Sequence, residues 1–206
     1  MNVILQNIGR RFNREWIFKN IDYTFTQGDS YAVLGPNGSG KSTLLQVIAG
    51  SLTPSQGTIR YGDDEKPVAD EQVFAQLSLA APYLELVEEF TLRELVDFHF
   101  RFKNYREGFD AQKVIGLLGF GTQANKMIRH FSSGMKQRTK LALAFCADTP
   151  LILLDEPGSN LDEAGLAWYH QLVTQFSPGR LLIIGSNQEP EYHFCKNRLQ
   201  VTDFKA

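Results

Sequence analysis

Hydrophobic positions divide this chain into short apolar runs and one long stretch of helical spacing. Strands are predicted where apolar residues alternate or run together between turn-forming residues. The continuous runs, such as residues 151–154, are typical of parallel strands that are covered on both faces. The strands expected on this basis span residues 3–8, 16–25, 31–34, 58–61, 77–80, 151–154, 181–185 and 199–202.

Apolar residues at helical spacing mark the remaining elements. Residues 41–49 and 163–176 are each predicted to form one helix, and the whole stretch from 91 to 147 is predicted to be helical until Pro150 ends it. One helical stripe in that stretch is made by Leu92, Leu95, Val96, His99 and Phe102.

This order of elements predicts a single α/β domain over residues 1–206. A mostly parallel sheet is expected, together with an antiparallel β part at the N-terminus. Residues 85–148 are expected to form an inserted α-helical subdomain, and residues 1–84 and 149–206 are expected to form the α/β core.

Composition narrows the class of protein. Of the 206 residues, 43% are hydrophobic and 21% are charged, as in ordinary globular proteins. The net charge of −2 predicts no broad contact with nucleic acid. There are two cysteines, and Cys146 lies in an apolar run, which predicts a buried thiol and no disulfide framework. No signal peptide and no membrane-spanning segment are expected, so any membrane contact is expected only through a partner.

Candidate chemistry begins with residues 35–43, which read Gly-Pro-Asn-Gly-Ser-Gly-Lys-Ser-Thr between a predicted strand and a predicted helix. This is a complete phosphate-binding loop, so the α/β part is predicted to be a P-loop NTPase core. Glycines let successive backbone N–H groups face phosphate oxygens, and the helix N-terminus adds its positive end. The residues expected to bind nucleotide are Gly35, Pro36, Asn37, Gly38, Ser39, Gly40, Lys41, Ser42 and Thr43.

Two residues of the loop have specific roles in this prediction. Lys41 can reach the β- and γ-phosphates, and Ser42 can ligate Mg²⁺. The apolar run 151–154 then ends in Asp155 and Glu156, beyond the carboxyl end of a strand, where ligands of parallel sheets lie. Asp155 is expected to hold Mg²⁺ through a water molecule and Glu156 to orient or deprotonate the attacking water. The alternative is a solvated pair of acids at a strand end.

A second candidate for anion binding precedes a helix. Ser132, Ser133 and Gly134 offer a hydroxyl, backbone donors and a helix N-terminus. Taken alone, these residues favour an ordinary helix cap.

Together these motifs resemble those of an ABC-family ATPase, the nucleotide-binding subunit of an ATP-binding-cassette transporter, and they occur in that family's order. Residues 35–43 match its Walker A loop and residues 151–156 match its Walker B strand. Residues 131–135 resemble its signature motif and residues 159–162 its D-loop. Phe12 stands where the family places an aromatic residue that stacks on adenine, with Trp16 as a second candidate.

The resemblance implies a mechanism. Two cassettes, identical or different, pair head to tail, and each ATP with its Mg²⁺ lies between the phosphate loop of one subunit and Ser132 and Gly134 of the other. Lys41, Glu156 and the residue at position 187 are the implied catalytic residues. Hydrolysis releases the dimer and drives a separate transmembrane permease. The implied location is cytoplasmic, at the inner face of the cell membrane through that partner, with no nucleic acid involved.

The chain departs from the family's pattern at three places. Asn187 stands at the position of the switch histidine, which predicts slower hydrolysis with ATP binding retained, because a carboxamide cannot carry the imidazole's charge. His193 is expected to be a surface residue rather than a substitute. Residues 81–86 lack the glutamine of the family's Q-loop, and Ser133 and Met135 replace a glycine and a glutamine of the signature.

Other functions stay open at this stage. The alternatives to a transporter ATPase are a soluble ABC ATPase and a weakly active ATP-binding regulatory partner in a heterodimer. Residues 187–190, Asn-Gln-Glu-Pro, resemble the His-Gln-Pro of haem-exporter ATPases, which suggests that kind of exporter. Aromatic residues of the helical part are expected to be mostly core, or else, with Tyr83 and Leu86, a partner surface; they are Phe98, Phe100, Phe102, Tyr105 and Phe109.

Overall fold

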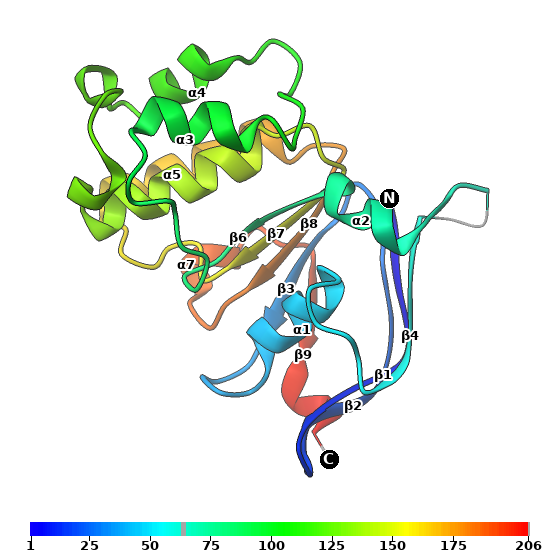
Figure 1. Ribbon diagram of the computed structural model, residues 1–206. Coiled ribbons are helices and arrows are strands. Elements are labelled where there is room, and N and C mark those ends of the chain that lie inside the picture. Colours follow the sequence, from blue (N-terminus) through cyan, green and yellow to red (C-terminus); the bar gives the residue numbers. More distant parts are fainter. Residues whose placement is uncertain (63–64, 206) are drawn as a thin grey trace. The chain divides into compact units, whose positions relative to one another are not determined.

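The computed structural model describes residues 1–62 and 65–205, which fall into two compact units (Figure 1). The first unit contains residues 1–79, 150–156 and 179–206, and the second contains residues 80–149 and 157–178. The sequence pattern placed residues 157–178 in the α/β core, whereas here they belong to the second unit together with the other long helix. The α/β class, with a parallel sheet, an antiparallel part and an inserted helical part, is confirmed.

The antiparallel sheet of the first unit has the order β2-β1-β4-β5. Its strands are β1 (Val3–Phe12), β2 (Glu15–Phe25), β4 (Gln56–Gly62) and β5 (Pro67–Val68). The register of β1 against β2 shifts three times, and Asn7, Asn13 and Asn20 have positive φ angles of 52°, 53° and 55°. Asparagine tolerates this conformation better than most residues, so these positions form bulges and a turn in the long strand pair.

The second sheet has the order β6-β7-β8-β3-β9, formed by β3 (Ser30–Leu34), β6 (Leu77–Ala80), β7 (Leu151–Asp155), β8 (Leu181–Gly185) and β9 (Asn197–Gln200). The β7–β8, β8–β3 and β3–β9 pairs are parallel. Every residue of β7 and β8 is buried, as expected from their continuous apolar sequence. The last strand lies earlier in the sequence than predicted. β9 ends at Gln200, and Val201–Phe204 forms the 3₁₀ helix η3.

Among its described residues, the first unit also contains three α-helices. Helix α1 (Lys41–Ile48) lies where it was predicted, whereas α2 (Asp70–Gln76) was not predicted; the third helix is α7 (Glu189–Tyr192), which ends just before His193. Leu44, Leu45 and Ile48 of α1 are fully buried in one hydrophobic cluster with residues of both sheets. Each such side chain stabilises the fold by roughly 1.5–3 kcal/mol. The helix that starts at the phosphate loop is therefore held firmly against the sheet.

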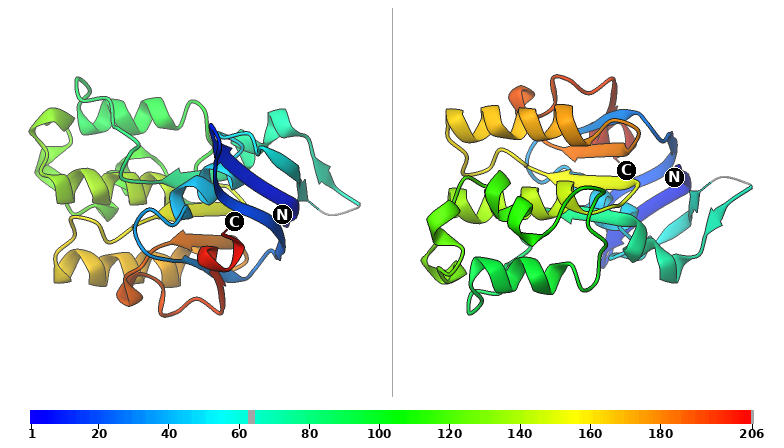
Figure 2. Two further views of the ribbon diagram at one scale, coloured as in Figure 1. Left: turned by 90° about the horizontal axis from the view of Figure 1, so that it is seen from below. Right: turned by 90° about the horizontal axis from the view of Figure 1, so that it is seen from above.

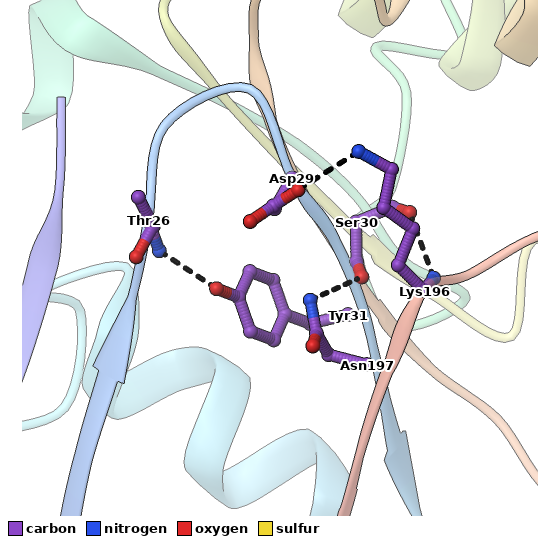
Figure 3. A network of polar contacts seen from close by, with 6 residues as sticks. All are labelled: Thr26, Asp29, Ser30, Tyr31, Lys196 and Asn197. Carbon is purple, nitrogen blue, oxygen red and sulfur yellow. Dashed lines mark hydrogen bonds and ion pairs between the residues drawn. The ribbon is translucent and has the colours of Figure 1, made fainter.

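A network of polar contacts ties the start of β3 to its surroundings (Figure 3). The amide of Thr26 donates to the Tyr31 hydroxyl at 3.0 Å, and the Lys196 ammonium contacts the Asp29 carboxylate at 2.9 Å. The backbone amide of Lys196 donates to the Ser30 hydroxyl at 3.1 Å, and the Asn197 carboxamide donates to the Ser30 carbonyl at 3.4 Å. These contacts fix β3 at the end opposite the phosphate loop.

Helices form most of the second unit (Figure 2). They are α3 (Leu92–His99), α4 (Ala111–Leu117), α5 (Ser133–Cys146), α6 (Glu163–Phe176), and the 3₁₀ helices η1 (Gly121–Gln123) and η2 (Ile128–His130). The prediction of continuous helix from 91 to 147 was therefore too simple. Side chains of Thr91, Asp110 and Ser132 cap the helices that follow them, and these caps mark the interruptions.

The predicted helical stripe is only partly buried in the core of the second unit. Leu92, Leu95 and Val96 are buried, but Phe102 lies beyond the end of α3 and is 59% exposed. Phe98 is also exposed, and its ring contacts that of Phe102 edge to face. The remaining predicted core aromatics, Phe100, Tyr105 and Phe109, pack partly buried against the cluster. Tyr83 is exposed, whereas Leu86 packs partly buried against the cluster.

Both cysteines, Cys146 and Cys195, are buried, and neither forms a disulfide within the part of the chain that the structure describes. Burial raises the pKa of the Cys195 thiol to about 12, because the thiolate would lose its solvation. Across the residues that the structure describes, no helix has the length and apolar character needed to cross a membrane.

Candidate functional site

The phosphate loop connects β3 to α1 and borders a cavity of about 190 Å³. Gly35, Gly38 and Gly40 have φ angles of 150°, 76° and 107°. Residues with a Cβ atom rarely adopt such positive values. A Cβ atom on Gly40 would lie 2.5 Å from Cγ2 of Ile17. The cavity is lined by Ile17, Asn37, Gly38, Gly40, Lys41, Ser42, Thr43 and Glu156.

Lys41 is the first residue of α1, and its ammonium group closes the loop. It is 4% exposed and donates hydrogen bonds to the carbonyls of Gly35, at 2.9 Å, and Pro36, at 3.3 Å. The amide of Ser39 donates to the Pro36 carbonyl at 3.0 Å. A charged group that is this buried requires hydrogen-bond partners, and the loop's own carbonyls supply them. The loop therefore holds the shape of a phosphate cradle by itself.

Asp155 ends β7 directly opposite Gly185 of β8 and is 1% exposed. Burial raises the pKa of its carboxyl group; a hydrogen bond from Ser42 and the charge of Lys41 lower it, and the charge of Glu156 raises it. Within the described residues, its Oδ1 atom is buried and has no hydrogen-bond partner.

These donors fit a magnesium ion. An unpartnered buried carboxylate oxygen beside a serine hydroxyl supplies the oxygen ligands that Mg²⁺ prefers, directly or through water. Asp155 and Ser42 are therefore chemically suited to the metal role that the sequence predicted for them.

Glu156 follows Asp155 in the sequence and lines the cavity at the phosphate loop. Its amide donates to the Gly185 carbonyl at 2.8 Å, and its φ angle is 44°. A non-glycine residue in this conformation costs roughly 1 kcal/mol or more and is found preferentially at functional sites. The backbone thus turns sharply after β7 and places the Glu156 side chain at the cavity.

Asn187 follows β8 and is exposed. Its Nδ2 atom donates to Oδ1 of Asn37 in the phosphate loop at 3.1 Å. The structure therefore brings together Lys41, Ser42, Asp155, Glu156 and Asn187 within the first unit. His193 is exposed, as the sequence analysis expected.

The aromatic candidates lie near the end of the β1–β2 pair. Phe12 is 46% exposed, and the Arg10 guanidinium lies 4.6 Å from its ring centroid. The Trp16 ring is instead contacted by Lys19 and Arg11, at 4.8 Å and 5.5 Å. Ile17, which lines the cavity, was missed by the sequence analysis, because only its contact with Gly40, distant in sequence, reveals it.

The signature residues lie in the second unit, around a separate cavity of about 320 Å³. The Ser132 hydroxyl accepts a hydrogen bond from the Met135 amide at 3.2 Å, so it is the N-cap of α5. A Cβ atom on Gly134 would lie 2.8 Å from the Asn160 carbonyl oxygen, which explains why glycine is needed there. This cavity is lined by Phe120, Ser132, Ser133, Gly134, Met135, Arg138, Asn160, Leu161 and Asp162.

The segment that lacks the expected glutamine has its own anchor in the second unit. The Lys140 ammonium donates to the carbonyls of Ala81 and Pro82, both at 3.1 Å. Burial lowers the pKa of Lys140, while the charge of Glu85 raises it. Glu85 itself is exposed, as a solvated carboxylate would be.

Comparison with known proteins agrees with this geometry. Residues 18–159 match the family model described as ABC transporter. The chain belongs to the ABC transporter family. The cytochrome c biogenesis ATP-binding export protein CcmA of Mesorhizobium japonicum is 30% identical over 92% of this chain and 93% of its own length. An uncharacterized ABC transporter ATP-binding protein of Bacillus subtilis, YcbN, is 28% identical over 91% of this chain, which spans 62% of that protein.

Solved ABC cassettes share the fold. A dimeric structure of MJ0796, a bacterial ABC transporter cassette, superposes with a TM-score of 0.81 at 22% identity, covering 97% of this chain and 94% of the other. The chain is thus an ATP-binding protein of the ABC ATPase class.

Proposed function

We propose that this ABC ATPase dimerises on ATP and hydrolyses it to power transport by a separate membrane permease. The observation that carries the proposal is the cavity at the phosphate loop, which Lys41, Ser42 and Glu156 line together. The names of its relatives, which describe ATP-binding proteins of ABC transporters, support the same function.

In this proposal the phosphate loop binds the triphosphate of ATP. Its backbone N–H groups and the N-terminus of α1 face the phosphate oxygens. Lys41 exchanges its hydrogen bonds to the carbonyls of Gly35 and Pro36 for the β- and γ-phosphates. Because an ammonium paired with phosphate gains more than one paired with neutral carbonyls, this exchange favours binding.

Ser42 and Asp155 would hold the magnesium ion, which neutralises part of the phosphate charge when it is bound. Oδ1 of Asp155, which has no hydrogen-bond partner among the described residues, is the atom best suited to orient a water molecule bound to the magnesium ion. Glu156 would accept a hydrogen bond from the attacking water and so orient or deprotonate it. Phe12 would stack on adenine after Arg10 moves from its ring face, or while Arg10 keeps the opposite face.

The second copy of the chain would complete the site. Ser132 and Gly134 lie at the N-terminus of α5, which attracts an anion. The dimeric cassette with the same fold is the structural precedent for such pairing. ATP between the two copies would hold them together, and hydrolysis would release them.

The dimer part of the proposal is tested with a Glu156→Gln variant, which should bind ATP without hydrolysing it. With MgATP this variant is expected to sediment as a dimer in analytical ultracentrifugation, and without nucleotide as a monomer. A variant that binds ATP but stays strictly monomeric would contradict the dimeric site. Wild-type protein that neither binds nor hydrolyses ATP would contradict the whole proposal.

A second candidate is a weakly active ATP-binding regulatory partner in a heterodimer. It is favoured by Asn187 and by the Ala81–Pro82 segment held by Lys140 in place of a Q-loop glutamine. Turnover separates the two functions: steady hydrolysis of ATP supports the first, and ATP binding without turnover supports the second.

The permease is tested by capturing the tagged chain in mild detergent from its own cells. A stoichiometric multi-span membrane protein is expected. The similarity to CcmA favours an exporter of the cytochrome c biogenesis type, in which case loss of the gene should lower the amount of c-type cytochrome. Ribosomal or DNA-bound proteins without a membrane partner would favour a soluble ABC protein instead.

A further inference from the structure

A buried polar pair stands beside Asn187. Ser186 is fully buried and Glu191 is 2% exposed, and the Ser186 hydroxyl donates a hydrogen bond to Oε2 of Glu191. Glu191 lies in α7, one turn further along the chain than Asn187. Burying a carboxyl group is costly unless it is hydrogen-bonded, so a pair of this kind marks a place where a defined geometry matters.

Further hydrogen bonds hold residues 186–191 together around this pair. The Gln188 amide donates to the Ser186 hydroxyl at 2.9 Å, and the Glu191 amide donates to the Gln188 carbonyl at 3.0 Å. On the other side, the Ser186 amide donates to the Val33 carbonyl of β3 at 3.2 Å. β3 is the strand that leads into the phosphate loop. The residues before and after Asn187 are therefore both fixed, and one of them is fixed to the strand that carries the candidate site.

The side chain of Asn187 projects from this segment to the phosphate loop, where it donates to Asn37 at 3.1 Å. An asparagine side chain has only two rotatable bonds, and its amide nitrogen lies closer to the backbone than the far nitrogen of a histidine ring. A residue with such a short reach depends on the position of its backbone more than a histidine does.

We propose that Ser186 and Glu191 are positioning residues that hold the Asn187 carboxamide at the γ-phosphate end of the phosphate loop. On nucleotide binding, Asn187 exchanges its hydrogen bond with Asn37 for one with the phosphate. The inference rests on the proposed ATPase function and names the residues that set the geometry of its active site.

The first test compares Ser186→Ala with Ser186→Thr. The alanine variant loses the hydroxyl that bonds both Glu191 and Gln188, whereas the threonine variant keeps it. Single-turnover hydrolysis of MgATP is expected to fall about 10-fold in Ser186→Ala, with the Kd for ATP within about 2-fold of wild type, since an interaction made mainly in the transition state is lost. Ser186→Thr is expected to keep most of the rate.

Glu191 supplies a second pair of variants in case threonine does not fit at the buried position. Glu191→Gln keeps an oxygen that accepts the Ser186 hydroxyl and should hydrolyse ATP within about 2-fold of wild type, whereas Glu191→Ala should match Ser186→Ala. Unchanged single-turnover rates in both alanine variants would overturn the proposal.

A double-mutant cycle separates positioning from general destabilisation. In an Asn187→Ala background, Ser186→Ala is expected to cause no further loss of rate, because the residue that it positions is gone. An equal loss of about 10-fold in both backgrounds would overturn the proposal and assign Ser186 to stability alone.

A readout that does not depend on turnover is the ¹⁵N–¹H signal of the Asn187 side-chain amide, assigned by its disappearance in Asn187→Asp. Binding of a non-hydrolysable ATP analogue with Mg²⁺ is expected to shift this signal in wild type and much less in Ser186→Ala. Equal shifts in both proteins would overturn the proposal. If wild type binds no nucleotide at all, the proposed ATPase function fails first, which is a distinguishable result.

Discussion

The phosphate loop and the signature cavity are built in different ways. The loop depends on glycines at φ angles that other residues avoid, and Lys41 closes it from within. Around the signature cavity, Ser132 caps an ordinary helix, and a Cβ atom on Gly134 would clash with the Asn160 carbonyl oxygen. The loop thus keeps its shape through its own backbone and Lys41. The signature residues already have their local hydrogen bonds and packing, and in the proposed dimer a second molecule would give them their function.

The largest effect is expected from a substitution in the phosphate loop itself. In Gly40→Ala, the new methyl group meets Ile17 and the backbone must keep a φ of 107°. Its affinity for ATP should fall about 100-fold, because strain and a clash act together. Gly38→Ala is the matched control, since its φ of 76° is also positive but nothing lies within 4 Å of the added atom. Isothermal titration calorimetry measures both variants, and equal losses would contradict the role of Ile17.

The signature cavity should respond differently. Gly134→Ala, made in the Glu156→Gln background, is expected to weaken ATP-dependent dimerisation at least about 10-fold and to leave ATP binding by the monomer unchanged. Its added methyl group would lie 2.8 Å from the Asn160 carbonyl oxygen and displace that segment. Gly121→Ala, where nothing lies within 4 Å, serves as the control. Sedimentation with and without MgATP provides the measurement, and loss of monomer binding in Gly134→Ala would remove the contrast between the two cavities.

A smaller effect is expected where the first unit departs from its family. Asn187→His should raise the rate of ATP hydrolysis about 5-fold, because an imidazole can carry charge that a carboxamide cannot. The Kd for ATP should change by less than about 2-fold. Steady-state turnover and nucleotide titration together give the result. Rapid hydrolysis by wild type, with no gain in the histidine variant, would show that Asn187 does not limit the rate.

A prediction about stability rather than activity concerns the second unit's response to acid. Burial, with a smaller effect of the Lys103 charge, lowers the pKa of His99 to about 4. Because the unfolded chain binds this proton more readily, the stabilisation is complete above about pH 6.5 and is lost as the pH falls toward 4. The loss between pH 7 and pH 5 should be roughly 2 kcal/mol.

The comparison that checks this pH effect is between wild type and His99→Gln, which has no imidazole to protonate. Urea unfolding at pH 7 and pH 5 should show a smaller difference in the variant. The same pH dependence in both proteins would assign the acid sensitivity to other groups.

Local patterns were sufficient to predict the phosphate loop, the buried strands β7 and β8 and the two acids at the end of β7, Asp155 and Glu156. These features depend on residues adjacent in sequence, because strand burial and helix starts are set over a few positions. Helix α2 was missed because it is short and has no side-chain cap. Phe102 was assigned to the core because helical spacing was extended past the actual end of α3 at His99.

Contacts between distant residues could not be predicted. The approach of Ile17 to Gly40, the bond between Asn187 and Asn37 and the anchor from Lys140 to Ala81 each join residues far apart in the sequence. Such contacts depend on how the elements pack, and no local pattern records that.

The asparagine bulges of the antiparallel sheet affect how the protein behaves at high concentration. Strand β2 lies at the sheet's edge, and an unbroken edge of eleven residues would offer its free backbone groups to another chain. Asn20 and the shifts of register interrupt that edge, and Lys19 places a charge beside it. Strand addition from a neighbouring molecule is therefore disfavoured, which protects against aggregation.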